Sequence, residues 1–498
     1  MTLQELYIAL LVGGVVVLVS IVATRLAAVA GLPSLLIFLG LGVLLGHDVL
    51  GLNFDNVQTA QDLGTAALAV ILVEGGLTTR WSEIRAVVAP AGVLGTVGVG
   101  VSAAVTAVGA HLLLGFDWQL AFLFGAILSS TDAAAVFAIL RIVPLPKRVV
   151  GLLEAESGFN DAPAVILVVL LSTVPLHVDP LEIVLTMAYE LGAGAAIGLA
   201  FGFAGAFVLP RLALPASGLY PLAIFGIGMV AFAAAGSAHA SGFLAAYLCA
   251  LVLANTGLPH RAATRSFAEG LGWLAQIGLF VLLGLLVDPS ELGPQILPAL
   301  LIGLVVLLLA RPASVFASLM PFRVPVREQI FLSFAGLRGA VPIVLSTFPI
   351  VAGIDGSVRV LNIVFVLVVL FTLVQGPNLS PFAKWLRIAP KENTRRIDVE
   401  SAPLDVLDAE LLTVTIHPGS RLDSVSILEL RLPERSVITL IIREGNNIVP
   451  ERSTRLRTGD EMLIVTSRKQ REQTERRLRA VSRKGSLARW FGEYGETE

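Results

Sequence analysis

A short polar stretch interrupts an apolar part of the chain in GLLEAESGFNDAPAVILVVLLSTV, which begins at Gly151. Glu156, Asn160 and Asp161 stand here in front of a long run of apolar residues. An ionised carboxylate in hydrocarbon costs at least a few kcal/mol, so it persists only where it is paired, protonated or facing a wet cavity. The stretch is therefore a candidate functional site.

Read as an α-helix, the stretch presents two polar patches. Ser157 and Asp161 are four residues apart and share one face, whereas Glu156 and Asn160 share the adjoining face. At 1.5 Å per residue Asp161 lies about 18 Å into the segment, near the middle of a hydrocarbon core about 30 Å thick. We expect both patches to point inward. Glu154 lies nearer the membrane interface and is expected to be a solvated or vestibule residue.

A second polar island, FLFGAILSSTDAAAVFAIL, precedes the first and contains Thr131 and Asp132. Its segment crosses the membrane in the opposite direction and holds the island at a similar depth. Asp132 and Asp161 can therefore meet near the membrane midplane, where two carboxylates suit a cation.

A third island, SFAGLRGAVPIVLS, places Arg338 between glycines. A guanidinium does not lose its proton, so a buried arginine needs an anionic partner, and Glu156 and Asp132 are the available acids. Gly336 and Gly339 permit unwound backbone, which is tolerated inside a membrane where it lines a cavity. A static ion pair that only fixes helix register is the alternative for Glu156 and Arg338.

The elements that position these islands are membrane-spanning helices. Of the 498 residues 55% are hydrophobic and 14% are charged, with mean hydropathy +0.84, whereas soluble domains carry roughly 25% charged residues. Apolar windows predict thirteen spans. They lie near residues 6–24, 33–46, 62–77, 87–114, 118–141, 149–173, 182–209, 218–236, 241–257, 267–287, 295–310, 327–350 and 358–376.

Charged residues in the connections predict the orientation. Lys and Arg fall in alternate connections between the predicted spans. We assign Arg311 and Arg323 to one of these connections. Since cytoplasmic loops are rich in these residues, the N-terminus is expected outside and the C-terminus in the cytoplasm. The first span lacks the basic start of a secretory signal. Cys249 is the single cysteine, so no intrachain disulfide and no cysteine-based metal cluster can form.

The C-terminal region has the character of a soluble domain. ELLTVTIHPGS, SVITLIIREGNNIVP and DEMLIVTS predict β-strands, with REGNN as a hairpin turn. In SRLDSVSILELRLP, the spacing of Leu422, Val425 and Leu428 predicts a helix behind a capping serine. We predict a transmembrane domain over 1–385, a linker over 386–404, a small α/β domain over 405–482 and a basic tail over 483–498.

Three motifs, ESGFNDAPAV, SSTDAAAVFA and SFAGLRGAVP, resemble the monovalent cation/proton antiporter superfamily, in the branch of the NhaP-type antiporters. The tail resembles the TrkA C-terminal regulatory domain, and that pairing is typical of the potassium/proton antiporters called cell volume regulation proteins. The resemblance implies an all-α polytopic membrane protein of about 13 transmembrane helices with an inverted-repeat antiporter fold.

The resemblance also implies roles for individual residues. Asp161 would bind cation and proton alternately, and an alkali cation would lie at Asp161 and Asp132. Ser157 and the backbone of Thr131, in an unwound crossing, would complete that site. The family places a structural ion bridge at the remaining positions, Glu156, Arg338 and Asn160. Members with an Asn-Asp pair resemble electroneutral exchangers, so one-for-one exchange is expected.

The expected function is antiport of K⁺ for H⁺, serving pH homeostasis and cell volume regulation at the plasma membrane. Burial penalises the charged form of Asp161 and a bound cation stabilises it, so proton and cation exclude each other. The alternatives are a sodium/proton antiporter and a regulated cation channel; no repeated filter loop such as TVGYG supports the channel.

The remaining expectations concern other molecules. No HExxH or nucleophile motif is found, so an enzyme is not expected, and neither a resident cofactor nor a nucleic-acid partner is expected. The partners implied are membrane lipid, a second copy of the chain in a homodimer, and a nucleotide ligand of the C-terminal domain.

Overall fold

The chain folds into two compact units, residues 1–389 and 390–498, in a computed structural model. The structure describes residues 3–30, 34–46, 54, 56–131, 145–173, 180–212, 214–257, 260–388, 398–404, 409–467 and 469–484.

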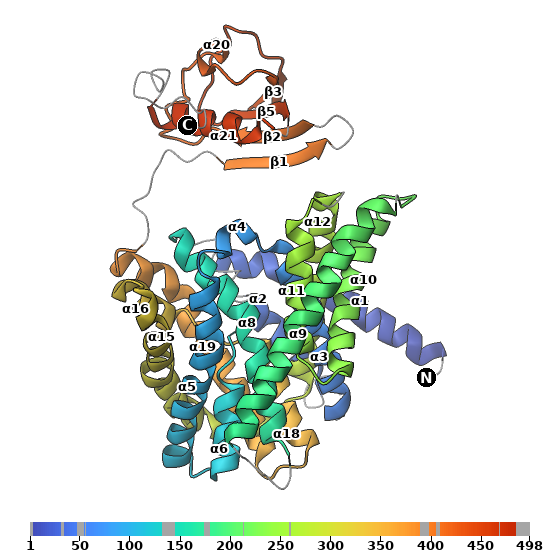
Figure 1. The fold of residues 1–498 in the computed structure, drawn as a ribbon, viewed down its shortest axis with the longest axis vertical. Helices are drawn as coiled ribbons and strands as arrows, with labels where there is room; N and C mark the ends of the chain where they lie inside the picture. Colours follow the sequence, from blue (N-terminus) through green and yellow to red (C-terminus); the bar gives the residue numbers. More distant parts are fainter. Residues whose placement is uncertain are drawn as a thin grey trace. The chain divides into compact units, whose positions relative to one another are not determined.

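The described part of the first unit consists of helices and their connections, without a β-strand (Figure 1). Its helices are α1 (Leu3–Ala30), α2 (Ser34–Leu45), α3 (Val57–Thr78), α4 (Trp81–Ile84), α5 (Val88–Leu114), α6 (Trp118–Ile127), α8 (Lys147–Leu171), α9 (Pro180–Val208), α10 (Leu219–Ser237), α11 (Gly242–Asn255), α12 (Arg261–Leu285), α13 (Pro289–Leu292), α14 (Ile296–Val305), α15 (Arg311–Leu319), α16 (Val326–Phe334), α17 (Ala340–Leu345), α18 (Thr347–Val351) and α19 (Ser357–Trp385).

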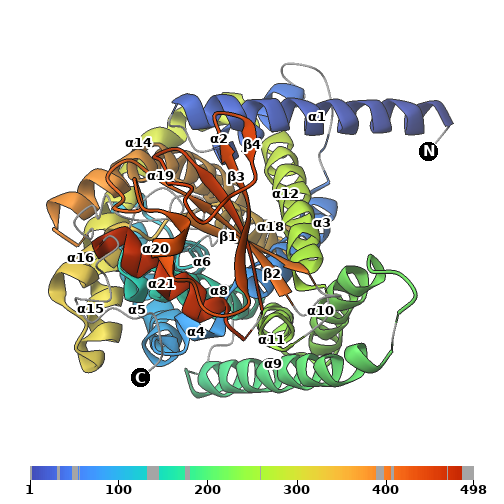
Figure 2. The same cartoon turned by 90° about the horizontal axis from the view of Figure 1, so that it is seen from above.

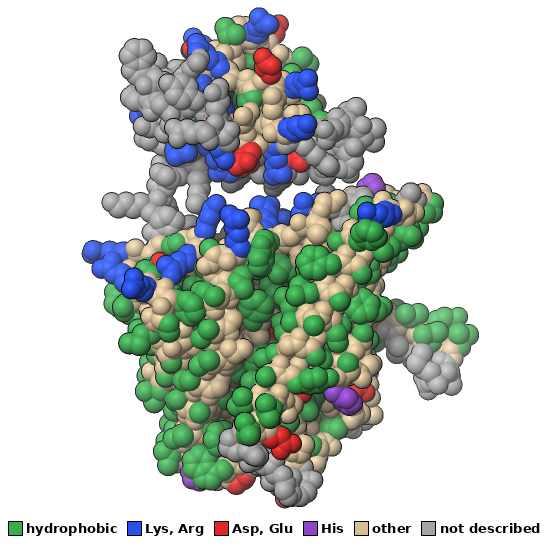
Figure 3. All heavy atoms as spheres, in the orientation of Figure 1, with side chains coloured by type: hydrophobic (Ala, Val, Ile, Leu, Met, Phe, Trp, Pro, Cys, Tyr) green, Lys and Arg blue, Asp and Glu red, His purple; other side chains and the backbone are tan. Residues whose placement is uncertain are grey.

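Seven helices in the described part are long and apolar enough to cross a membrane. Each predicted span coincides with a helical segment, except that the second half of 118–141 lies outside the described residues. The number thirteen remains a prediction. Hydrophobic side chains cover the flank of the unit, and Lys and Arg gather at one end of it (Figure 3).

Several helices begin or end where the sequence supplies a cap. Asn56 Oδ1 accepts the backbone N–H of Thr59 at 2.9 Å at the start of α3, and the Asp117 carboxylate accepts the N–H of Gln119 at 3.1 Å at the start of α6. α5 ends at Gly115, whose φ of 69° lies in the left-handed region. These caps satisfy backbone groups that a helix end leaves without partners.

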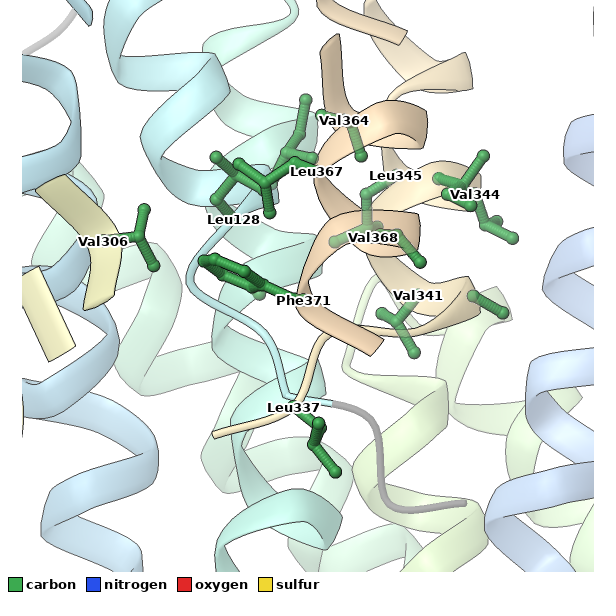
Figure 4. Packing of buried hydrophobic residues seen from close by; sticks show 14 of the residues in the cluster. Leu128, Val306, Leu337, Val341, Val344, Leu345, Val364, Leu367, Val368 and Phe371 are labelled. Carbon is green, nitrogen blue, oxygen red and sulfur yellow. The ribbon is translucent and has the colours of Figure 1, made fainter. Parts of the chain in front are cut away.

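Helical structure gives way to irregular backbone at two places inside the unit. Such backbone is tolerated within a membrane only where it is buried in protein or lines a cavity. α6 ends at Ile127 and the backbone continues without helical structure to Thr131. Residues 335–339 separate α16 from α17, which confirms the prediction of unwound backbone around Gly336. Leu128 and Leu337, from the two interruptions, belong to one apolar cluster with Leu367 and Phe371 of α19 (Figure 4).

The helix α8 lies between two groups of helices (Figure 2). On one side it packs against α5 and α6, and α5 packs in turn against α15. On the other side it meets α11, which packs extensively against α3, α9 and α10. α8 thus contacts both groups.

The second unit is a five-stranded antiparallel sheet in the order β1-β2-β5-β3-β4. Its elements are β1 (Asp398–Leu404), β2 (Ala409–Thr415), α20 (Ile427–Leu430), β3 (Ser436–Arg443), β4 (Asn446–Ile448), β5 (Glu461–Ser467) and α21 (Arg471–Lys484). Leu412 and Ile464 of the sheet share one core with Leu478 and Val481 of α21. This unit therefore has a hydrophobic core of its own.

Two sequence predictions for this unit are corrected and one is confirmed. Residues 398–404, expected in the linker, form an edge strand. The expected helix shortens to α20, because the backbone N–H of Ser424 and the carbonyl of Val425 bond to Leu456 instead of continuing a helix. Leu428, expected on its buried face, is 63% exposed. The hairpin turn at REGNN is confirmed, since Arg443 pairs with Asn446.

Candidate ion-binding site

The two polar patches of α8 are both buried in the structure. Ser157 and Asp161 are 1% and 5% exposed, and Glu156 and Asn160 are 2% and 1% exposed. None of these side chains faces lipid, because α8 is covered by its neighbours along this turn. The expectation that both patches point inward is therefore met.

The interruption after α6 brings backbone and hydroxyl groups to the Asn-Asp pair. Ser130 Oγ donates a hydrogen bond to Asp161 Oδ1 at 2.6 Å. Beside it, Asn160 Nδ2 donates to Thr131 Oγ1 at 2.5 Å. The structure thus brings Thr131 to the Asn-Asp pair, as expected, but Asn160, which was expected at the ion bridge with Glu156 and Arg338, bonds to Thr131 instead. Asp132, the other expected cation ligand, lies outside the described residues.

Ser130 is a residue whose place at the site the sequence pattern did not single out. Its hydroxyl meets the Asp161 carboxylate, and its backbone carbonyl accepts a hydrogen bond from Arg338 Nη1. The signal was present in the run Ser129, Ser130, Thr131, but spacing alone does not say which hydroxyl of an unwound segment points at the carboxylate.

Arg338 connects the two interruptions, since it lies between α16 and α17 and bonds to the carbonyl of Ser130. It is fully buried, and its Nε and Nη2 have no hydrogen-bond partner among the described residues. Arg311 and Glu156 both lie within electrostatic range of its guanidinium. Arg338 therefore holds unwound backbone beside the site.

The hydrogen-bonded partner of Glu156 is Arg311, which corrects the expected pairing with Arg338. Arg311 Nη1 and Nη2 donate to Glu156 Oε1 and Oε2 at 2.5 and 2.9 Å, a bidentate contact between side chains that are 5% and 2% exposed. Such a two-point contact is the strongest geometry for this pair of residue types. The predicted ion bridge exists at Glu156, but with a different arginine.

Arg311 was not expected at the site because the charge pattern places it in a cytoplasmic connection. In the structure α14 continues through a π-helical segment, Val306–Ala310, into α15, so Arg311 lies inside a long helical run and is 4% exposed. The signal was the sequence ASVFASLM after Pro312, which is apolar enough to extend the span past the arginine.

Two glycines make room for this arrangement. A Cβ on Gly336 would lie 2.5 Å from Arg311 Nε, so the unwound backbone between α16 and α17 passes directly over the arginine. A Cβ on Gly95 would lie 3.3 Å from the backbone nitrogen of Asn160, which brings α5 close to α8 at the site. Small residues at these positions allow the close approach that buried helices need.

The chemistry available at the site is that of a carboxylate among oxygen donors. Asp161, the Ser130 hydroxyl, the Thr131 hydroxyl and backbone carbonyls of the irregular segment are the kinds of group that an alkali cation prefers. Ser157 lies one turn before Asp161 on the same face and is buried with it. The carboxylate can hold a proton or a cation, each of which removes the cost of a bare buried charge.

The chain is similar to known proteins along most of its length. Residues 14–385 match the family described as "Sodium/hydrogen exchanger, transmembrane", and residues 411–479 match the TrkA-C domain. A protein named K(+)/H(+) antiporter NhaP from Alkalimonas amylolytica is 36% identical over 473 residues, which are 93% of this chain and 82% of that protein.

Two further proteins are similar. One is named K(+)/H(+) antiporter NhaP2, from Shewanella baltica (strain OS223), and is 34% identical over 97% of this chain and 85% of its own length. The other is the solved structure of the sodium proton antiporter MjNhaP1 from Methanocaldococcus jannaschii, with a TM-score of 0.66 and 21% identity, covering 78% of this chain and 100% of that one.

Proposed function

Because the chain belongs to the sodium/hydrogen exchanger family and is a cation/proton antiporter, we propose that it exchanges K⁺ for H⁺ at Asp161. The observation that carries the site is the buried Asp161 carboxylate, which accepts the Ser130 hydroxyl at the interruption after α6. Potassium is supported by the names of the relatives, which are K⁺/H⁺ antiporters, and by the TrkA-C domain of this chain.

Exchange at this site follows from competition for one carboxylate. A proton neutralises Asp161, and a cation bound by its oxygens neutralises it equally, so the two exclude each other. The empty, charged form is disfavoured in hydrocarbon, so the loaded forms are the ones that cross. Asn160 supports one-for-one exchange, because an amide at this position adds no second titrating charge.

The proposal places the chain in the plasma membrane with its C-terminal domain in the cytoplasm. Lys and Arg at one end of the membrane unit support this orientation (Figure 3). Asp132 and Ser157 remain proposed ligands, and Glu156, Arg311 and Asn160 are proposed to hold the site rather than to bind the ion. We also propose a homodimer and a nucleotide ligand for the TrkA-C domain. We do not propose that the protein transforms a substrate chemically.

The test is proton flux in liposomes that contain the purified protein. We expect K⁺ added on one side to drive proton movement, with the same rate at zero and at an imposed membrane potential, because one-for-one exchange moves no net charge. Na⁺ added in place of K⁺ is the matched comparison. A greater response to Na⁺ would overturn potassium as the substrate, and a potential-driven cation current without proton movement would indicate a channel.

Removal of the C-terminal unit tests its regulatory role. This unit has its own core, so a chain that ends after Ile388 should still insert and exchange cations for protons. We expect the maximal rate to persist while the dependence on internal pH or K⁺ changes. The measurement is the flux assay above on the shortened and the full chain. Loss of the folded membrane unit would contradict a purely regulatory role.

A further inference from the structure

A second carboxylate lies on the same face of α8 as Asp161. Glu154 precedes Asp161 by seven residues, which is about 700° around the helix, or two turns less about 20°. The separation along the axis is about 10 Å at 1.5 Å per residue. Glu154 is half-buried, in contrast to the fully buried Asp161, and lies toward the end at which α8 begins. It is thus placed between that side of the membrane and the site.

Charged groups of α4 border Glu154 on one side. A Cβ on Gly151, one turn before Glu154, would lie 2.9 Å from the carbonyl oxygen of Glu83, so α4 packs directly on α8 here. Glu83 and Arg80, which form an exposed ion pair at 3.7 Å, both act electrostatically on Glu154. Water and ions can reach these exposed groups, so Glu154 lies at the edge of a solvated region.

Tyr247 of α11 borders Glu154 on the other side. A Cβ on Gly158 would lie 2.4 Å from Tyr247 Cζ, so the ring rests directly on α8 at Gly158. Gly158 comes four residues after Glu154 and three before Asp161, on the same face. The ring therefore covers the helix surface between the two carboxylates. Phe159 holds the ring in an edge-to-face contact with centroids 5.8 Å apart.

The hydroxyl of Tyr247 is buried where the ring rests on α8. Tyr247 is 2% exposed, and its hydroxyl makes no well-formed hydrogen bond to any residue in the described part of the chain. It lies beside Thr79 and within electrostatic range of Glu154. The Thr79 hydroxyl already donates to the carbonyl of Gly75 at 2.7 Å. Because the Thr79 proton goes to Gly75, Thr79 can only accept from Tyr247, which leaves the lone pairs of the tyrosine oxygen for a further ligand such as a cation.

The wall that carries Tyr247 is fixed in place. Asn255, at the end of the same helix α11, accepts the backbone N–H of Trp81 at 2.8 Å and donates to the carbonyl of Thr79 at 3.1 Å. The corner between α3 and α4 is thus hydrogen-bonded to α11. Tyr247, Thr79 and Arg80 therefore form one surface opposite Glu154 on α8.

We propose that Glu154 and the Tyr247 hydroxyl form a second, transient site for the exchanged monovalent cation, on the side where α8 begins, with the Tyr247 ring closing the path to Asp161. The inference rests on the proposed function. A carboxylate and a phenolic oxygen are suitable ligands for an alkali cation that keeps part of its water. Displacement of the ring from Gly158 would then let the ion pass to Asp161.

The test is a side-specific measurement of cation dependence in right-side-out and inside-out membrane vesicles. E154Q should raise the half-saturating K⁺ concentration on the side where α8 begins by about fivefold or more, with the maximal rate retained, the pattern expected when binding alone is weakened. The half-saturating concentration on the opposite side should not change. Y247F, which keeps the ring and removes the hydroxyl, should shift the same parameter in the same direction.

Glu269→Gln is the matched control, because Glu269 is an exposed carboxylate of α12 paired with Arg265 outside this cluster. It should behave as the unaltered protein on both sides. Unchanged half-saturation in both E154Q and Y247F would overturn the proposal, as would an equal shift on the two sides. If E154Q fails to fold, Y247F decides alone. Retained exchange in Asp161→Asn would instead overturn the proposed function, so the two failures are distinguishable.

Discussion

Asp161→Asn should abolish cation/proton exchange while the protein still folds. Asparagine has nearly the shape of aspartate and keeps an oxygen that can accept the Ser130 hydroxyl, which bonds to Asp161 at 2.6 Å. It can neither take up a proton nor carry the charge that attracts a cation. We therefore expect a loss of at least about a hundredfold in the proton flux, more than removal of a single neutral ligand would cause. The measurement is K⁺-driven proton flux in liposomes.

Asp117→Asn provides the matched control for this substitution. Asp117 caps α6 in the same bundle, and asparagine is an equally good helix cap, so exchange and thermal stability should stay at the level of the unaltered protein. Asp161→Asn should elute as the same species in size-exclusion chromatography. Substantial exchange in a folded Asp161→Asn protein would remove this carboxylate from the mechanism.

The helices and the positions of the polar islands were predictable because a membrane imposes strong, local rules on sequence. Apolar windows define the spans, and a buried charge stands out against them. The depth of Asp161 follows from counting residues along one helix. For the same reason the spacing of Asn160 and Ser157 is enough to assign them to faces of α8.

The pairing between helices was less predictable, because it depends on distances that no single segment contains. Arg338 was the obvious partner for Glu156 as long as Arg311 was counted in a loop. The π-helical segment Val306–Ala310 and Gly336 together turn Arg311 onto Glu156, and neither effect can be read from spacing. Ser130 was missed in the same way, since the direction of a side chain in unwound backbone follows no helical period.

The short helix of the C-terminal unit shows the opposite failure, in which a local pattern was overruled. Leu422 and Val425 have helical spacing and are buried. The backbone beside them, however, forms strand-like hydrogen bonds to Leu456 in place of helical ones. The helix begins only at Ser426, whose capping box with Glu429 fixes its start. Tertiary hydrogen bonds here outweigh a marginal helix propensity.

Arg311→Ala should strongly destabilise the membrane unit, because it leaves Glu156 as a buried charge without its hydrogen-bonded partner. Removing one member of a buried ion pair typically costs about 3–5 kcal/mol. The pair joins α8 to α15 through two hydrogen bonds at 2.5 and 2.9 Å, and both side chains are almost fully buried. Thermal unfolding of the purified protein in detergent measures the change. Arg211→Ala, at an exposed arginine, should have little effect.

Two double variants determine which arginine is the true partner of Glu156. Glu156→Gln alone leaves Arg311 and Arg338 as neighbouring like charges, so it should destabilise the protein about as much as Arg311→Ala does. Adding Arg311→Met removes the charge that lost its partner and should restore most of the stability, since a buried pair replaced by well-packed neutral groups is often tolerated. Adding Arg338→Met instead should not restore the stability, because Arg338 also holds the carbonyl of Ser130.

Restoration by Arg338→Met and not by Arg311→Met would return the ion bridge to Arg338. That outcome would mean that Arg311 faces Glu156 without carrying the energy of the contact.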